Sequence, residues 1–135
     1  FAFSTFVMKA LARIPAPQGI AAMQAINITA VTFVFMTALF GTALGCLALA
    51  GAAIFAVDRS LESVELLSGA ALYLFGVIGV TIAANVPRND ALARLSPDAP
   101  GAEHAWKDYL TTWTAWNHVR TLCAIAAAVA LMLAL

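Results

Sequence analysis

The sequence predicts an all-α integral membrane protein, folded as a bundle of four transmembrane helices in a single domain, residues 1–135. Hydrophobic residues make up 63% of the chain and charged residues only 10%, whereas a soluble domain has roughly 45–50% and about 25%. Three long apolar runs also follow one another, each sufficient to cross a bilayer core of roughly 30 Å. A soluble fold of this length could not hide so much apolar surface.

The first predicted helix, residues 1–13, would be only about 20 Å long at roughly 1.5 Å per residue. It is therefore expected to be a span truncated at its N-terminus. Pro15 and Pro17 then interrupt the helix, because proline lacks the backbone donor and suits a first helical turn.

The second helix is expected over residues 18–57, with its membrane span at 31–57. The span contains Gly41 and Gly45 in a small-xxx-small pattern, which lets two helix backbones approach closely. That face could pack within the chain, or it could bind a second copy or another membrane partner.

The third helix is expected over residues 63–86, with Ser60 as its N-cap. Its three regularly placed glycines predict another close-packing face: Gly69, Gly76 and Gly79. Pro87 is expected to end this helix, because the residue before a proline resists the helical conformation. Residues 88–102 form the one substantial polar loop, and the last helix follows over 103–135.

Basic residues near the helix ends predict the orientation, because they concentrate in cytoplasmic loops. Only Arg59 falls on one side, and the other side holds Lys9, Arg13, Arg88, Arg94 and Lys107. The loops at 14–30 and 88–102 are therefore expected in the cytoplasm, with both termini outside.

The charge and the titratable residues exclude several classes of function. Lysine plus arginine balances aspartate plus glutamate, so no net field attracts nucleic acid. His104 and His118 are nearly four helical turns apart, and Cys46 and Cys123 lie alone in apolar runs. The sequence therefore predicts no metal site.

Two polar clusters stand at the ends of apolar runs. Steps of three and four place Trp113, Asn117 and Arg120 on one stripe of the last helix, and Asn85, Asn89 and Asp90 surround Pro87. Asn27 precedes the second span at a similar predicted depth. Polar side chains are costly in lipid, so these residues form either a structural network between helices or a ligand pocket.

The neighbouring aromatic residues have a simpler interpretation. Tryptophan and tyrosine are enriched at membrane interfaces, where we expect Trp106, Tyr109 and Trp116. His118 lies beside the Asn117–Arg120 stripe, and we interpret it first as another interfacial side chain. Its unperturbed pKa near 6.5 would nonetheless suit proton transfer.

The polar pattern resembles a known family. Its marks are Phe3-Ser4, Ala22 to Asn27, Asn85-Val86-Pro87 with Asn89, and Trp113 with Trp116 to Arg120. They are similar to the small bacterial membrane family of unknown function that includes the fungal and actinobacterial anthrone oxygenases. The resemblance covers essentially the whole chain and implies a four-helix membrane bundle, in the bacterial inner (plasma) membrane. Lys9 departs from the pattern, which has a proline near this position.

The resemblance also implies oxygenation of an anthrone, an apolar aromatic ketone, with molecular oxygen as co-substrate and no metal or flavin. On that basis Arg120 would stabilise the enolate charge, with Asn117 and Asn85 as neutral donors. Trp113 would form a stacking wall, and His118 or Asp90 would be the base. The expected catalytic residues are thus Arg120, Asn117 and His118, and the expected ligand-binding residues are Asn27, Asn85, Asn89 and Trp113.

Two alternatives stay open. The chain could be a non-enzymatic membrane subunit or assembly protein whose polar residues only hold helices together. It could also bind or carry a quinone-like ring compound without chemistry.

Overall fold

The computed structural model describes residues 1–55 and 61–134, and these residues form helices and no strands. The all-α prediction is confirmed. The chain divides into two compact units: Phe1–Thr32 with Thr81–His118, and Phe33–Val80 with Val119–Leu135.

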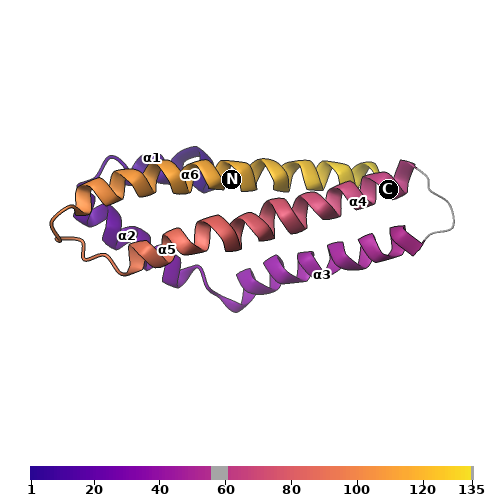
Figure 1. Cartoon of the computed structure of the whole chain (residues 1–135), viewed down its shortest axis with the longest axis horizontal. Coiled ribbons are helices and arrows are strands. Elements are labelled where there is room, and N and C mark those ends of the chain that lie inside the picture. The colour runs from indigo at the N-terminus through magenta and orange to yellow at the C-terminus, as the bar shows by residue number, and fades with distance from the viewer. Residues whose placement is uncertain (56–60, 135) are drawn as a thin grey trace. The chain divides into compact units, whose positions relative to one another are not determined.

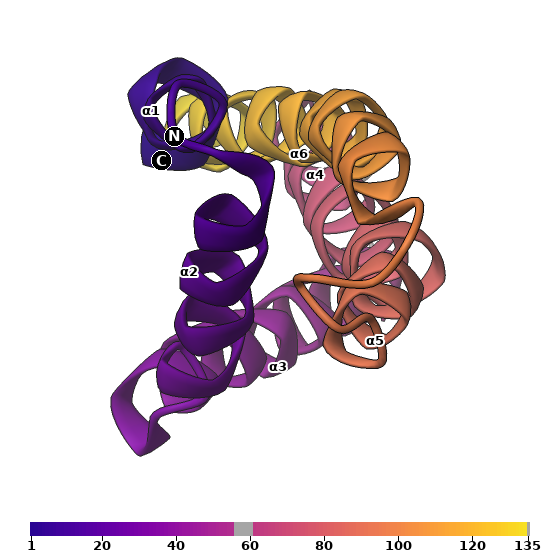
Figure 2. The same ribbon diagram turned by 90° about the vertical axis from the view of Figure 1, so that its left-hand side faces the viewer.

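The first unit contains two short N-terminal helical segments, helix α2, the helical segments on either side of Pro87 and the start of the last helix. In chain order these are η1 (Phe3–Val7), α1 (Met8–Leu11), α2 (Ala16–Thr29), η3 (Thr81–Asn85), α5 (Val86–Ala93) and the first half of α6 (Ala102–Leu133). Figure 2 shows the chain turning from α1 into α2, and α5 leading through residues 94–101 into α6.

The core of the first unit is mostly aromatic and aliphatic. Trp106 is 3% exposed and lies directly on Gly19, where an added Cβ would come within 2.7 Å of the indole ring. Gln24 joins α2 to the end of α5, because its Nε2 donates to the carbonyls of Leu92 at 2.8 Å and Leu95 at 2.9 Å. The same core also buries Met8, Leu11, Ile20, Met23, Tyr109 and Trp113.

The second unit contains α3 (Phe33–Phe55), α4 (Leu61–Ala71), η2 (Leu72–Gly79) and the second half of α6. Figure 1 shows α3 running beside α4. The Tyr73 hydroxyl donates to the carbonyl of Leu39 at 3.0 Å and so joins η2 to α3.

Glycines bring η2 and α4 close to α6 in this unit, as predicted for two of the three positions. An added Cβ at Gly69 would lie 2.7 Å from Leu131, and one at Gly76 would lie 2.5 Å from Cys123. The third position, Gly79, has its nearest neighbour within its own helix. The close-packing face therefore consists of Gly69 and Gly76.

Within residues 1–55 and 61–134, three helices are long and apolar enough to cross a membrane, as an integral membrane protein requires: Phe33–Phe55, Leu61–Ala93 and Ala102–Leu133. The short turns over Phe3–Leu11 and the 14-residue α2 are not among them.

The predicted helix over 18–57 is divided in the structure. Helix α2 ends at Thr29 and α3 begins at Phe33. β-Branched residues lose side-chain freedom in a helix, which lowers their helix propensity. Four such residues lie at the break: Ile28, Thr29, Val31 and Thr32. The predicted end at residues 56–57 and the cap at Ser60 lie outside the described residues.

The prediction that Pro87 ends the third helix is wrong. The chain stays helical through Pro87 to Ala93, with η3 just before the proline. Proline is tolerated in a first helical turn, and a wider π-helical turn relieves its clash with the preceding turn. The Arg88 guanidinium donates to the carbonyl of Ala84 at 2.8 Å, which satisfies a backbone acceptor beside the proline. The polar loop therefore shrinks to residues 94–101.

Gly41 and Gly45 are exposed, and an added Cβ at either would meet nothing within 4 Å. Their face makes no close helix contact among residues 1–55 and 61–134. The alternative, a partner on this face, stays a prediction.

Candidate functional site

The two predicted polar clusters meet in the first unit, at Asn89. The indole Nε1 of Trp113 donates to Asn89 Oδ1 at 2.7 Å, and the hydroxyl of Tyr109 donates to the same oxygen at 2.9 Å. An indole N–H can only donate, so the atom facing it must be the amide oxygen. The Asn89 side chain is thereby fixed, with its Nδ2 group turned away from these two donors.

Asn27 lies next to the same network, on α2. Its side chain is close to the Tyr109 hydroxyl, whose one proton is donated to Asn89.

An aromatic stack supports the network from α6. The rings of Trp106 and Tyr109 lie 5.6 Å apart at 12°, and those of Tyr109 and Trp113 lie 6.0 Å apart at 21°. Phe3 meets Trp113 edge-on at 5.6 Å. Such pairs add stability beyond simple burial, which makes this wall rigid.

The stack corrects one prediction. Trp106 and Tyr109 were expected at the membrane interface, but both are buried in the protein core. They follow the same steps of three and four as Trp113, so one face of α6 turns all three inward. Trp116 is 40% exposed, with Arg88 6.0 Å from its ring centre, and its place at the membrane interface stays a prediction.

Beside the network lies a groove between α2 and α5, of about 460 Å³. Four polar and four apolar residues line this α2–α5 groove: Gln24, Asn27, Ile28, Val31, Val86, Asn89, Asp90 and Ala93. Since its oxygen is bound on the α6 side, Asn89 offers the groove its amide hydrogens. Asp90 is exposed and adds a carboxylate.

Asn85 and Asn117 are more deeply buried than the groove residues, each 2% exposed. Asn117 Nδ2 donates to Ser4 Oγ at 2.7 Å, and Ser4 Oγ donates back to the Asn117 carbonyl at 3.3 Å. Asn85 Nδ2 makes a long bond of 3.5 Å to the carbonyl of Trp113, and its Oδ1 has no partner among the described residues. Asn117 thus holds η1 to α6, whereas Asn85 is only partly satisfied.

The two remaining predicted site residues are not among those that line the groove. His118 is exposed and is not among the groove residues. Arg120 is half-buried and belongs to the second unit. The residues that the structure brings together are therefore Asn27, Asn89, Asp90 and Trp113, with Asn85 beside them.

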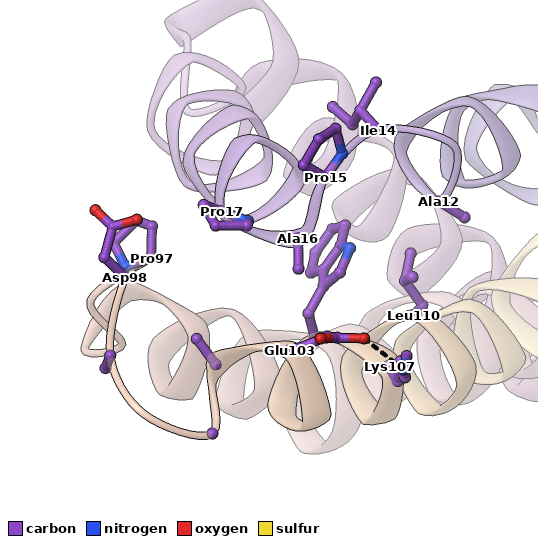
Figure 3. A pocket seen from close by; sticks show the side chains of 14 residues that line it. Ala12, Ile14, Pro15, Ala16, Pro17, Pro97, Asp98, Glu103, Lys107 and Leu110 are labelled. Carbon is purple, nitrogen blue, oxygen red and sulfur yellow. Dashed lines mark hydrogen bonds and ion pairs between the residues drawn. The ribbon is translucent and has the colours of Figure 1, made fainter.

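A larger cavity, of about 680 Å³, opens where residues 12–17 meet the start of α6. Figure 3 shows Pro15, Pro17 and Pro97 around it, with Glu103 and Lys107 at its edge. These two charges are exposed and pair with each other at 2.7 Å. The charged pair of this cavity is exposed, whereas the α2–α5 groove contains a partly buried amide that two hydrogen bonds orient, so the groove is the candidate site.

Sequence reasoning missed Tyr109, Ser4 and Gln24 as members of the site and its supports. For Tyr109 the signal was present, because it shares the face of Trp113. No sequence signal marks Ser4 as the partner of Asn117, since the two residues are 113 positions apart.

A family model described as anthrone oxygenase matches residues 30–130. This match bears out the resemblance over most of the chain. No curated protein and no solved structure matches the chain.

Proposed function

The chain belongs to the anthrone oxygenase family, and from this membership we propose that it oxidises an anthrone-type ketone with molecular oxygen in the α2–α5 groove. The observation that supports this proposal is the pairing of a carboxylate with a fixed amide donor on one groove wall. Asp90 and Asn89 are consecutive on α5, and Trp113 and Tyr109 orient Asn89. Apolar residues of both helices complete the wall, as a flat aromatic ligand requires.

The first step is removal of a proton from the methylene carbon opposite the ketone. The carboxylate of Asp90 takes this proton, and the electron pair moves through the rings to the ketone oxygen. The amide hydrogens of Asn89 donate to that oxygen as its charge develops. A preoriented donor of this kind stabilises the transition state without reorganising.

The second step needs only molecular oxygen. The enolate transfers one electron to O₂, the resulting superoxide and ligand radical combine at the methylene carbon, and Asp90 returns its proton to form a hydroperoxide. Loss of the second methylene hydrogen together with hydroxide leaves a carbonyl and one water. The sum is one anthrone plus one O₂ giving one anthraquinone plus one water, and the ligand itself is the reductant.

The groove favours Asp90 over His118 as the base, because Asp90 lines the groove and His118 does not. Asn85 remains a proposed second polar contact, since its buried Oδ1 has no partner in the described residues. For Arg120 and Asn117 we retain the proposed roles of charge stabiliser and donor, each to be tested by its own alanine variant.

The test is oxygen consumption by membranes that contain the protein and an anthrone. We expect Asp90→Asn to lower turnover about 100-fold or more, the usual contribution of a general base. Glu62→Gln, which removes an exposed carboxylate from the second unit, is the matched control and should change little. Equal turnover in both variants would exclude Asp90 as the base.

The same groove also supports the alternative of a quinone binder without chemistry. Tight binding of anthraquinone, with no oxygen uptake above empty membranes, would favour that alternative. Destabilised protein and no binding in the groove variants would favour a purely structural subunit.

The proposal includes a four-helix bundle in the bacterial plasma membrane, with residues 14–30 and 88–102 in the cytoplasm. Three helices of sufficient length and apolarity support it. With Cys46 and Cys123 replaced by alanine, Ser96→Cys should react with an impermeant maleimide in inverted vesicles and not in intact cells. The opposite pattern would reverse the topology.

A further inference from the structure

Two aromatic residues of α6 face the network and not the groove. Tyr109 and Trp113 are both buried, and neither is among the residues that line the groove. Each nonetheless donates a hydrogen bond to Asn89 Oδ1, at 2.9 Å and 2.7 Å. Both side chains therefore bind Asn89 from the side away from the groove.

An asparagine amide can rotate by half a turn at little steric cost, and this exchanges its donor and acceptor. With two donors directed at one atom, the rotated form would set the amide N–H groups against an indole N–H and a hydroxyl. That arrangement leaves buried donors unpaired, which is costly. The amide therefore stays with its hydrogens toward the groove.

We propose that Tyr109 and Trp113 are positioning residues that fix the hydrogen-bond polarity of the α2–α5 groove, so that Asn89 can only donate to a ligand. The inference deepens the proposed function, because an enolate oxygen requires a donor at this place. It concerns the polarity of a binding wall, so it can be tested without turnover.

The test compares two flat probes of similar size that differ in polarity. Anthraquinone offers only acceptors, and 2-aminoanthracene offers an amine donor. Dissociation constants are measured for both probes with the full chain in lipid nanodiscs. The quantity compared between variants is the dissociation constant of 2-aminoanthracene divided by that of anthraquinone. A ratio is insensitive to the fraction of protein that is folded.

Asn89→Asp is the decisive variant. Its carboxylate can still accept from Tyr109 and Trp113, but its second oxygen turns an acceptor toward the groove. We expect the wild-type preference for anthraquinone to reverse, with a change in the ratio of about tenfold, as for the gain and loss of a hydrogen bond. An unchanged ratio would overturn the inference.

Tyr109→Phe and Trp113→Phe should each move the ratio toward one by about threefold, since one of two fixing bonds is lost. Together they should abolish the preference. The matched controls are Tyr73→Phe, whose hydroxyl bonds the Leu39 carbonyl, and the half-exposed Trp116→Phe. A preference that survives in the double variant would contradict the inference, as would equal loss in the controls.

Oxygen uptake with an anthrone is measured on the same samples. If the ratio reverses in Asn89→Asp and the wild-type protein shows no turnover, the fixed polarity is supported and the oxygenase is contradicted. Turnover that depends on Asp90 together with an unchanged ratio in Asn89→Asp supports the oxygenase and contradicts the fixed polarity.

Discussion

In the first unit, side-chain hydrogen bonds at Asn89 and Asn117 join α5 and η1 to α6, whereas in the second unit α4 and η2 approach α6 at Gly69 and Gly76. Both are established ways to join helices in lipid. They differ in energetic cost. Burying an amide side chain is unfavourable unless it is hydrogen-bonded, whereas glycine has no polar side chain to satisfy. A network that is retained despite this cost marks the unit more suited to a site, and the α2–α5 groove lies there.

The largest effect is expected from filling a glycine contact of the second unit. Gly76→Val would place atoms on Cys123, where an added Cβ already comes within 2.5 Å. Overpacking of this kind costs about 1–3 kcal/mol, and unfolding in mixed micelles measures it. Gly41→Val is the matched control on an open face. Similar losses in both variants would show that close approach at Gly76 is unimportant.

An intermediate effect is expected from breaking the hydrogen bond between η1 and α6. Asn117→Leu and Ser4→Ala should each destabilise the protein by about 1 kcal/mol, and a double-mutant cycle should give a coupling of about 0.6–1.7 kcal/mol. The reason is the 2.7 Å bond from Asn117 Nδ2 to Ser4 Oγ. Additive losses would mean that the two side chains act independently.

The smallest effect on stability is expected at Asn85. Asn85→Leu should change the free energy of unfolding by no more than about 0.5 kcal/mol, because an unpartnered buried oxygen is replaced by an apolar group. Its one bond is long, at 3.5 Å. Anthrone turnover should fall although stability holds, whereas a loss of stability like that of Asn117→Leu would identify Asn85 as structural.

The sequence predicts features that depend on neighbouring residues better than features that depend on contacts between residues far apart in the chain. Apolar runs and helical steps of three and four are local, so the helical class and the shared face of Trp113 and Asn117 follow from them. The same spacing also places Tyr109 on the buried face of α6. The sequence-based prediction instead placed it at the membrane interface, because tyrosine is generally enriched there. The helix continues through Pro87 because a π-helical turn precedes it. Residue propensities do not predict that turn.

The groove was the least predictable feature. Asn27 and Asn89 are 62 positions apart by number, and only the packing of α2 against α5 brings them to one wall. The sequence identified both residues as polar exceptions in apolar surroundings. It could not say that Asn89 would turn its amide hydrogens toward the groove, because Tyr109 and Trp113 fix that orientation.

The most direct test of the central claim, that the α2–α5 groove is the ligand site, is photoaffinity labelling with a diazirine derivative of anthraquinone in native membranes. Mass spectrometry of the labelled peptides should locate the label within residues 24–31 and 86–93, and excess anthraquinone should prevent it. Competed label around residues 12–17 and 97–110 would place the ligand in the larger cavity and contradict the account.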